Sequence, residues 1–167
     1  MSLLVHGFPA ELGAEPRSLV LGSMPGRASL LAGRYYAHPR NAFWPIMAAL
    51  LGFSMDAPYP DRLACLQANG IGLWDVMAAC ERAGSLDADI VPASVRANDF
   101  AALFAVHRHI GRIFFNGAEA EKAFRRHVLP GLSASVPELY RLPSTSPAHA
   151  AMSFADKLAA WSVILTK

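Results

Sequence analysis

The sequence has little of several features that mark other classes of protein. It contains only two cysteines, Cys65 and Cys80, and no pair of His or Cys residues has zinc-finger spacing. Two cysteines are too few for a disulfide framework or a four-thiolate cluster, so we expect neither a metal nor a cofactor. No apolar stretch reaches the roughly 18 residues that a membrane span requires, and MSLLVHGFPAEL lacks the pattern of a signal peptide. These absences predict a cytoplasmic protein.

Lysine is also scarce. Of the 15 lysines and arginines, only Lys122, Lys157 and Lys167 are lysine, and the net charge is only +2. The strong positive field of many DNA-binding proteins is therefore missing. Arginine nonetheless suits phosphate recognition, because its guanidinium pairs bidentately with phosphate oxygens. A high-GC coding bias explains the same arginine excess, and composition alone does not separate the two explanations.

The composition is that of one compact domain. The chain has 167 residues, of which 53% are hydrophobic and 17% charged, with no internal repeat, low-complexity tract or long linker. We therefore expect a single domain over residues 1–167, and a monomer. Apolar runs of strand length alternate with patterns of helical period. The runs are Ser18–Gly22, Ile71–Asp75, Arg112–Asn116 and Glu138–Leu142, and the helical patterns are Ala42–Leu51, Pro60–Asn69, Asp99–His109 after the Asn98 cap, Ala118–Val128 and Phe154–Leu165 after the Ser153 cap.

This alternation predicts an α/β fold, a three-layer α/β/α sandwich with a central, mainly parallel four-stranded sheet. Strands that are apolar throughout their length indicate a sheet covered on both faces. In such folds the ligand lies in the crevice at the carboxyl ends of the strands. The segments that follow Gly22, Asp75, Asn116 and Leu142 are therefore the candidate site.

The first of these segments is the turn GSMPG, Gly22–Gly26. It is not a P-loop, because no Lys-Ser or Lys-Thr pair closes it, and it is not a GxGxxG turn. Two glycines around a proline let backbone N–H groups approach a base edge, a sugar or a phosphate. An ordinary turn at the exit of a strand has the same composition, so this motif alone is a weak signal.

The next segment, YYAHPRNAFW, combines several aromatic residues with Asn41. Aromatic faces of this kind stack on nucleobases and contribute about 1 to 3 kcal/mol per base. Asn41 has two possible roles: its side chain can cap the following helix, or its amide can hold a water molecule. The local sequence favours the cap.

The loop after the last strand reads LPSTSPAH, Leu142–His149. Its hydroxyl groups and free N–H groups, bounded by prolines, make a rigid element rich in donors that suits DNA phosphates. A plain Ser/Thr/Pro turn in front of a capped helix has the same appearance, and both readings stay open.

Taken together and in this order, these loops resemble the uracil-DNA glycosylase superfamily, from Val20 to about Trp161. The first motif of that superfamily is a Gly-x-x-Pro turn, here GSMPG, and its mismatch-specific members continue with a segment like FAHPANRFW, here YAHPRNAFW. The second motif is a Pro-Ser-rich loop, here LPSTSPAH. GIGLWDV and FFNGAEA take the places of strand ends that face the base. The match is closest to the hypoxanthine-DNA (deoxyinosine) glycosylase branch.

The resemblance implies a role for individual residues. Tyr36 matches the aromatic residue that stacks on the extruded base. Met24 stands where many relatives hold a catalytic Asp or Asn, and the hypoxanthine branch relies instead on the asparagine after the His-Pro pair, here Asn41. Asp75 aligns with the asparagine that reads the uracil edge, and a carboxylate there would accept the N1–H of hypoxanthine or the N3–H of uracil. A salt-bridged loop residue is the alternative for Asp75.

Further roles follow from the same resemblance. His38 is a second candidate catalytic residue, as a donor to the leaving base. Ala148 stands at the position of the wedge that fills the vacated stack and is too small for it, which leaves His149 or Arg40. Asn116 either turns into the crevice or caps the next helix. The remaining expected contacts are to the base by Gly22, Ser23, Met24, Pro25, Gly26, Phe43 and Asn116, and to DNA by Ser144, Thr145, Ser146, Ala148, His149 and Arg40.

The implied activity is hydrolytic removal of a deaminated base, hypoxanthine or uracil or both, from DNA in base-excision repair. A glycosylase that also nicks the strand needs an amine nucleophile, and no lysine lies in these loops. The sequence therefore predicts a monofunctional enzyme whose partner is DNA with a deaminated or mismatched base. The alternative, prompted by Met24, is a catalytically inert module that binds distorted or mismatched DNA.

Overall fold

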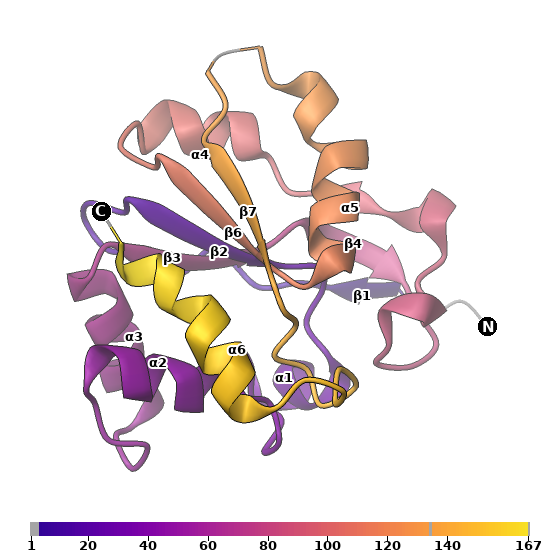
Figure 1. Cartoon of the computed structure of the whole chain (residues 1–167). Coiled ribbons are helices and arrows are strands. Elements are labelled where there is room, and N and C mark those ends of the chain that lie inside the picture. Colours follow the sequence, from indigo (N-terminus) through magenta and orange to yellow (C-terminus); the bar gives the residue numbers. More distant parts are fainter. Residues whose placement is uncertain (1–3, 134, 167) are drawn as a thin grey trace.

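A computed structural model describes residues 4–133 and 135–166 of the chain, so Met1 to Leu3 of the N-terminal segment lie outside it. Its centre is a sheet of four parallel strands in the order β3-β2-β6-β7 (Figure 1). The strands are β2 (Ser18–Gly22), β3 (Ile71–Asp75), β6 (Arg112–Asn116) and β7 (Glu138–Leu142). The predicted strands and the predicted fold class are confirmed.

Both faces of this sheet are covered, which explains why its inner strands are apolar without alternation. Along β2, the side chains of Leu19 and Leu21 belong to one hydrophobic core and that of Val20 to the other. β6 repeats the pattern, with Phe115 in the first core and Phe114 in the second. Phe114 and Phe115 are fully buried and belong to the core.

Helices form the two outer layers (Figure 1). The first core is closed by α4 (Phe100–Val106) and α5 (Ala118–His127), and the second by α2 (Phe43–Leu51), α3 (Tyr59–Ala68) and α6 (Phe154–Trp161). A short helix that the sequence did not predict, α1 (Arg27–Ala32), follows the Gly22–Gly26 turn. None of the described helices is long and apolar enough to cross a membrane.

Two predicted helices need correction, and the first of them, α4, ends at Val106 and not at His109. The cap of α4 is Asp99, whose carboxylate accepts from the N–H of Ala102 at 3.0 Å, and not Asn98. The Asn98 amide instead donates to the main-chain carbonyl of Asp75 at 2.7 Å. At the other end of the chain, Ser153 caps α6 as predicted, but the helix ends at Trp161 and continues as a 3-10 turn, Ser162–Leu165.

A second, antiparallel sheet in the order β1-β4-β5 was not predicted. Its strands are β1 (Leu4–His6), β4 (Met77–Glu81) and β5 (Arg96–Ala97). They are short, and β4 reads MAACE, without the β-branched residues that identify a strand in sequence. β4 begins just after β3, and the segment between β4 and β5 carries 3-10 turns at Asp87–Asp89 and Pro92–Ser94.

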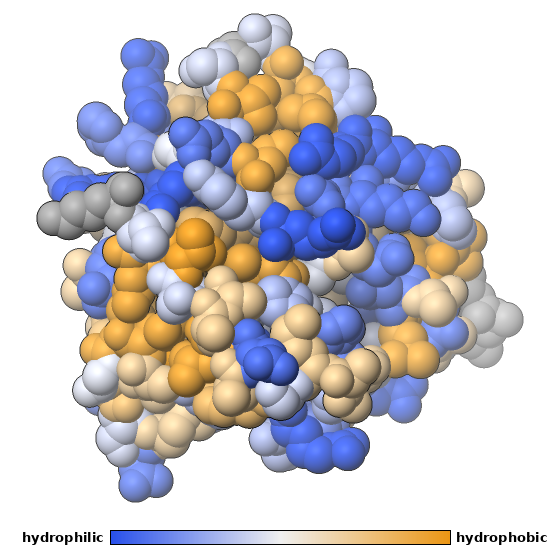
Figure 2. Space-filling model, in the orientation of Figure 1, coloured by the Kyte–Doolittle hydropathy of each residue, from blue (hydrophilic) through white to orange (hydrophobic). Residues whose placement is uncertain are grey.

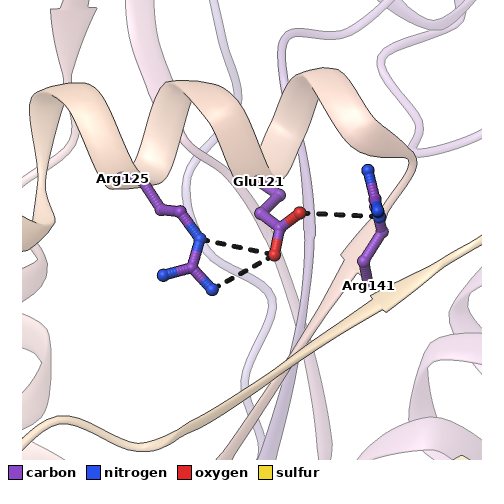
Figure 3. A network of polar contacts seen from close by, with 3 residues as sticks. All are labelled: Glu121, Arg125 and Arg141. Carbon is purple, nitrogen blue, oxygen red and sulfur yellow. Dashed lines mark hydrogen bonds and ion pairs between the residues drawn. The ribbon is translucent and has the colours of Figure 1, made fainter.

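One polar network ties α5 to β7. Glu121 of α5 pairs with Arg125 of the same helix at 3.2 Å and with Arg141 of β7 at 3.5 Å (Figure 3). On the face shown in Figure 2, hydrophilic residues gather over α5, whereas apolar ones are frequent over α2 and α6. Exposed ion pairs such as those of Glu121 contribute little to the free energy of unfolding, about 0.2 to 1 kcal/mol each. The packing of the two cores therefore holds the sheet together.

Candidate functional site

A groove of about 400 Å³ lies between the two loops that the sequence singled out. One wall is formed by Pro39, Arg40, Asn41, Ala42 and Pro45, and the other by Thr145, Ser146, Pro147, His149, Ala150, Met152, Phe154 and Lys157. The second wall follows the carboxyl end of β7, so the groove lies at the edge of the sheet where the α/β fold places its ligands.

Thr145 joins the two walls. It is 1% exposed, and its main-chain carbonyl accepts from the N–H of Ala42 at 2.9 Å. Asn116, at the end of β6, donates its amide to the Thr145 hydroxyl at 2.9 Å and accepts from the Thr145 N–H at 2.9 Å. Thr145 thus fixes the loop through hydrogen bonds within the protein, and its expected contact with DNA stays a prediction. Asn116 does not cap α5, because it is engaged with Thr145.

The glycine after Asn116 lets this loop pack closely. Gly117 has a φ of +95°, a conformation that side-chain-bearing residues rarely adopt, and a Cβ atom there would lie 3.1 Å from the Ser144 Cβ. The Gly117 N–H donates to the carbonyl of Leu142 at 3.0 Å. Ser144 is thus held against the end of β6.

Asn41 lies in the groove at the start of α2. Its Oδ1 accepts from the N–H of Phe43 at 2.9 Å, which is an Asx turn and leaves the side-chain N–H groups to act elsewhere. The two interpretations of Asn41 are therefore compatible, because the bond to the Phe43 N–H uses one oxygen lone pair of a residue that also lines the groove. His38 precedes it in a tight turn, and its Nδ1 accepts from the N–H of Arg40 at 3.0 Å. This bond leaves Nε2 of the neutral imidazole as the donor.

Tyr36 packs against Phe43, which is fully buried, with ring centroids 4.1 Å apart and an angle of 32° between the rings. Its φ of +56° is in the left-handed region, which is uncommon for an aromatic residue and indicates a backbone held by its surroundings. Tyr36 itself is partly exposed, but its hydroxyl is buried. Burial, and next the Asp75 carboxylate, raise the pKa of the Tyr36 phenol well above its ordinary value.

Asp75, at the end of β3, is 4% exposed and its Oδ2 has no hydrogen-bond partner among the described residues. Burial raises its pKa to about 7, and the nearby Asp87 carboxylate adds to the rise. Gly22 makes room for it, since a Cβ there would lie 2.5 Å from the Asp75 Oδ1 and 3.5 Å from the Tyr36 hydroxyl. The alternative of a salt-bridged Asp75 on a loop does not hold, because Asp75 is a strand residue with no ion pair within the described structure.

The Gly22–Gly26 turn is held from the side of the second sheet. The Ser23 hydroxyl donates to the Asp87 carboxylate at 2.6 Å, and the carbonyls of Gly22 and Ser23 accept from the N–H groups of Val76 and Met77. Met24 and Pro25 are buried, and Met24 belongs to the first core. The turn is therefore a fixed part of the scaffold.

The other residues expected to contact DNA differ in exposure. Arg40, Ala148 and His149 are exposed, while Ser144 and Ser146 are partly exposed and accept hydrogen bonds from the N–H groups two residues further on. Sequence reasoning missed Lys157, which lines the groove from α6. It is 5% exposed, and its ammonium donates to the carbonyl of His149 at 2.7 Å. No sequence motif marks Lys157, and only the fold, which brings α6 against the second loop, places it there.

Within residues 4–133 and 135–166, no group of three or more His, Cys, Asp or Glu side chains is arranged to hold a metal ion. The residues that line the groove offer amide, imidazole, hydroxyl and guanidinium groups and the buried lysine, whereas the Asp75 carboxyl is not among them. Such groups suit hydrolysis with a positioned water molecule, together with recognition of a polar heterocycle.

Comparisons with known proteins agree with this geometry. The family model described as the uracil DNA glycosylase superfamily matches residues 9–165. A protein of Methanosarcina barkeri (strain Fusaro / DSM 804), named hypoxanthine DNA glycosylase, is 35% identical over 116 residues, which cover 69% of this chain and 72% of that protein. A protein of the same name from Methanosarcina acetivorans is 37% identical over 119 residues, which cover 71% and 74%.

A similar solved structure is the solution NMR structure of a candidate uracil DNA glycosylase from Methanosarcina acetivorans. The TM-score is 0.77 at 32% sequence identity, and the match covers 97% of this chain and 99% of that one. The similarity thus includes both walls of the groove.

Proposed function

Since this chain belongs to the uracil DNA glycosylase superfamily, we propose that it is a monofunctional DNA glycosylase that flips out a deaminated base, hypoxanthine or uracil, and removes it by hydrolysis. Two relatives carry the name hypoxanthine DNA glycosylase, which favours hypoxanthine. The observation that carries the proposal is the groove that brings Asn41 of the first loop opposite Ser146 and His149 of the second. We further propose that the enzyme acts as a monomer in the cytoplasm.

The first step is extrusion of the nucleotide, which costs a few kcal/mol and is easiest for a mismatched or wobble-paired base. Tyr36 stacks on the extruded base, with Phe43 behind it as support. The carboxylate of Asp75 accepts the ring N–H that deamination creates, at N1 of hypoxanthine or N3 of uracil. Recognition of that N–H separates a deaminated base from adenine or cytosine, whose ring nitrogen at this place is an acceptor.

Bond cleavage then requires a water molecule and stabilisation of the departing base. Asn41 places the water, because its amide lies in the groove while its own orientation is fixed by the bond to the Phe43 N–H. The sugar passes through an oxocarbenium-like state as the base leaves as an anion. N–H groups of the Gly22–Gly26 turn and Nε2 of His38 stabilise that anion, since preorganised donors give the largest catalytic contribution.

The second loop holds the DNA backbone. Ser146 and the exposed His149 and Arg40 line the groove, and we assign them, with the nearby Ser144, to the phosphates and to the gap left by the flipped base. Ser146 and the turn from Ser146 to His149 are fixed by local hydrogen bonds, so the loop presents its donors in one shape.

The monofunctional character is supported by how Lys157 is held. A lyase step needs a free amine, and the ammonium of Lys157 is buried and bonded to the His149 carbonyl. Burial lowers the pKa of Lys157 below its ordinary value, which favours the neutral amine, so the support comes from its bond to the His149 carbonyl. We therefore expect no covalent adduct when the enzyme is mixed with inosine-containing DNA and borohydride; an adduct at Lys157 would refute the monofunctional assignment.

One experiment tests the activity itself. Duplex oligonucleotides with a single inosine or uracil, opposite each of the four bases, are incubated with the protein and treated with alkali to cut abasic sites. Strand cleavage that depends on both protein and lesion supports the proposal. Tight binding of these duplexes without cleavage supports instead a module that only recognises distorted DNA. This is the second candidate function, because the buried Met24 stands where many relatives hold a catalytic residue.

A further inference from the structure

A buried arginine lies behind the Gly22–Gly26 turn. Arg82 is 2% exposed, and its Nη2 donates to the carbonyl of Pro25 at 2.6 Å. Its Nε and Nη1 have no hydrogen-bond partner in the described part of the chain. Arginine is rarely buried unless its charge is compensated, so this position calls for a specific cause.

Unpartnered polar atoms gather at this turn. Across the described residues, the buried side-chain nitrogen and oxygen atoms without a partner are those two of Arg82, the Tyr36 hydroxyl and the Asp75 Oδ2. Asp75 and Tyr36 meet over Gly22, and Arg82 holds Pro25 three residues further along the same turn. Buried polar groups without partners are uncommon in folded proteins, and a cluster of them calls for a specific explanation, such as a bound water or a functional role.

The charged groups around Asp75 have opposite effects on its pKa. The Arg82 guanidinium lowers the pKa of Asp75, whereas burial and the Asp87 carboxylate raise it, to the net value of about 7. The Tyr35 and Tyr36 phenols also feel the Asp75 charge, and both have a raised pKa. Arg82 is the cation that favours the ionised form of Asp75 in this surrounding.

We propose that Arg82 is a positioning residue of the glycosylase site: it fixes the Gly22–Gly26 turn through the Pro25 carbonyl and supplies the buried positive charge that favours the hydrogen-bond-accepting form of Asp75. The inference rests on the proposed function, in which Asp75 accepts the ring N–H of the deaminated base. In this proposal the second sheet positions Arg82, since Arg82 directly follows β4 (Met77–Glu81) and lies behind the turn.

The test compares Arg82→Met with Ser85→Ala as the control. Ser85 is exposed and its hydroxyl accepts from the N–H of Arg27 at 3.1 Å, so its removal loosens the same region without changing a charge. The ¹³C shift of the Asp75 carboxyl, assigned with Asp75→Asn, is followed against pH. We expect Arg82→Met to move the titration midpoint upward by about one pH unit, and Ser85→Ala to leave it in place.

The reaction supplies a second readout. The rate of single-turnover removal of hypoxanthine is measured from about pH 5.5 to about pH 9, a range that spans the titration of Asp75. In Arg82→Met the rising limb of the profile should move upward with the NMR midpoint, with a loss of about fivefold at pH 7 as less Asp75 is ionised. Arg82→Lys, which keeps the charge, should restore the position of the limb. A general loosening of the turn would lower the rate at every pH and leave the limb where it was.

An unmoved midpoint in a folded Arg82→Met protein overturns the proposal. If that variant does not fold, Arg82→Gln, which keeps a donor for the Pro25 carbonyl but no charge, takes its place. Failure of both neutral variants to fold also overturns it, in favour of a purely structural arginine. If the wild-type protein excises neither base, the proposed function fails, while the NMR titration still decides whether Arg82 controls the charge of Asp75.

Discussion

Asn116 and Thr145 are joined by two hydrogen bonds of 2.9 Å each. The side-chain amide of Asn116 donates to the Thr145 hydroxyl, and the main-chain N–H of Thr145 donates to Oδ1 of Asn116. Through the bond from Ala42 to the Thr145 carbonyl, the end of β6, the second loop and the start of α2 become one unit. The distance between Asn41 and the second wall of the groove is therefore set by Thr145.

Thr145→Val should separate this structural role from any contact with DNA. It keeps the shape but leaves the Asn116 amide without its acceptor in a buried place, which costs about 1 to 3 kcal/mol. Urea unfolding measures the loss. A double-mutant cycle with Asn116→Ala should show a strongly non-additive total, because both changes remove the same bond. Additive losses would mean that the two side chains act independently.

Asn41 is tested with a matched pair of variants. Asn41→Ala removes the amide and should lower single-turnover excision by about 10²- to 10³-fold, as for loss of one preorganised catalytic group. Asn41→Asp keeps an oxygen that can accept from the Phe43 N–H, so the start of α2 is preserved while the amide N–H groups are lost. Thermal unfolding of each variant is the control for stability. Excision by Asn41→Ala at the wild-type rate would remove Asn41 from the catalytic role.

The fold was largely predictable, because the sequence patterns that specify its strands and helices are local and recur along the chain. Each strand of the main sheet is an apolar run ended by Gly, Asp, Asn or Pro, and each long helix shows a helical period. The antiparallel sheet was not predictable in the same way, because β4 consists mostly of small residues and β5 has two residues. Its pairing depends on β1, far away in sequence, which no local pattern reveals.

Asp75 makes stability depend on pH in a defined direction. Its folded pKa of about 7 lies above the value of about 3.9 expected when unfolded, so the native state binds this proton more tightly. The stabilisation that results is complete below about pH 4 and is lost as pH rises to about 7. Asp75→Asn should remove this dependence and stabilise the protein at pH 8 by up to about 4 kcal/mol, while abolishing base recognition.

Urea unfolding of both proteins at several pH values between about 4 and 8 checks this sign. The wild-type and Asp75→Asn curves should diverge as pH rises, with the variant the more stable of the two. Curves that stay parallel across this range would show that Asp75 has an ordinary pKa in the folded protein, and the inference about Arg82 would lose its electrostatic half.

Lys157 should contribute to DNA binding through the loop that it holds. Lys157→Met removes the donor to the His149 carbonyl and a positive charge at the groove. We expect weaker binding of an inosine duplex and a slope of log K against log salt that is smaller by up to about one. Lys157→Arg, which keeps the charge, is the control for the slope. An unchanged slope in Lys157→Met would restrict Lys157 to holding the loop.

The site was predictable only in its parts. The loops could be identified from Gly, Pro, Ser and aromatic residues, but the partners that fix them could not. Thr145 resembles a phosphate ligand in sequence, and only its burial against Asn116 shows that its hydroxyl is already used. Arg82 and Lys157 belong to segments without any motif, and the tertiary fold alone brings them to the turn and the groove.

The two walls of the groove also have a consequence for synthesis. The wall that carries Asn41 is synthesised well before the wall from Thr145 to Lys157, because it precedes that wall in the sequence. A nascent polypeptide that already has β2, β3 and β6 therefore still lacks a place to bind damaged DNA. A chain whose synthesis stops before Thr145 would therefore lack the second wall of the groove.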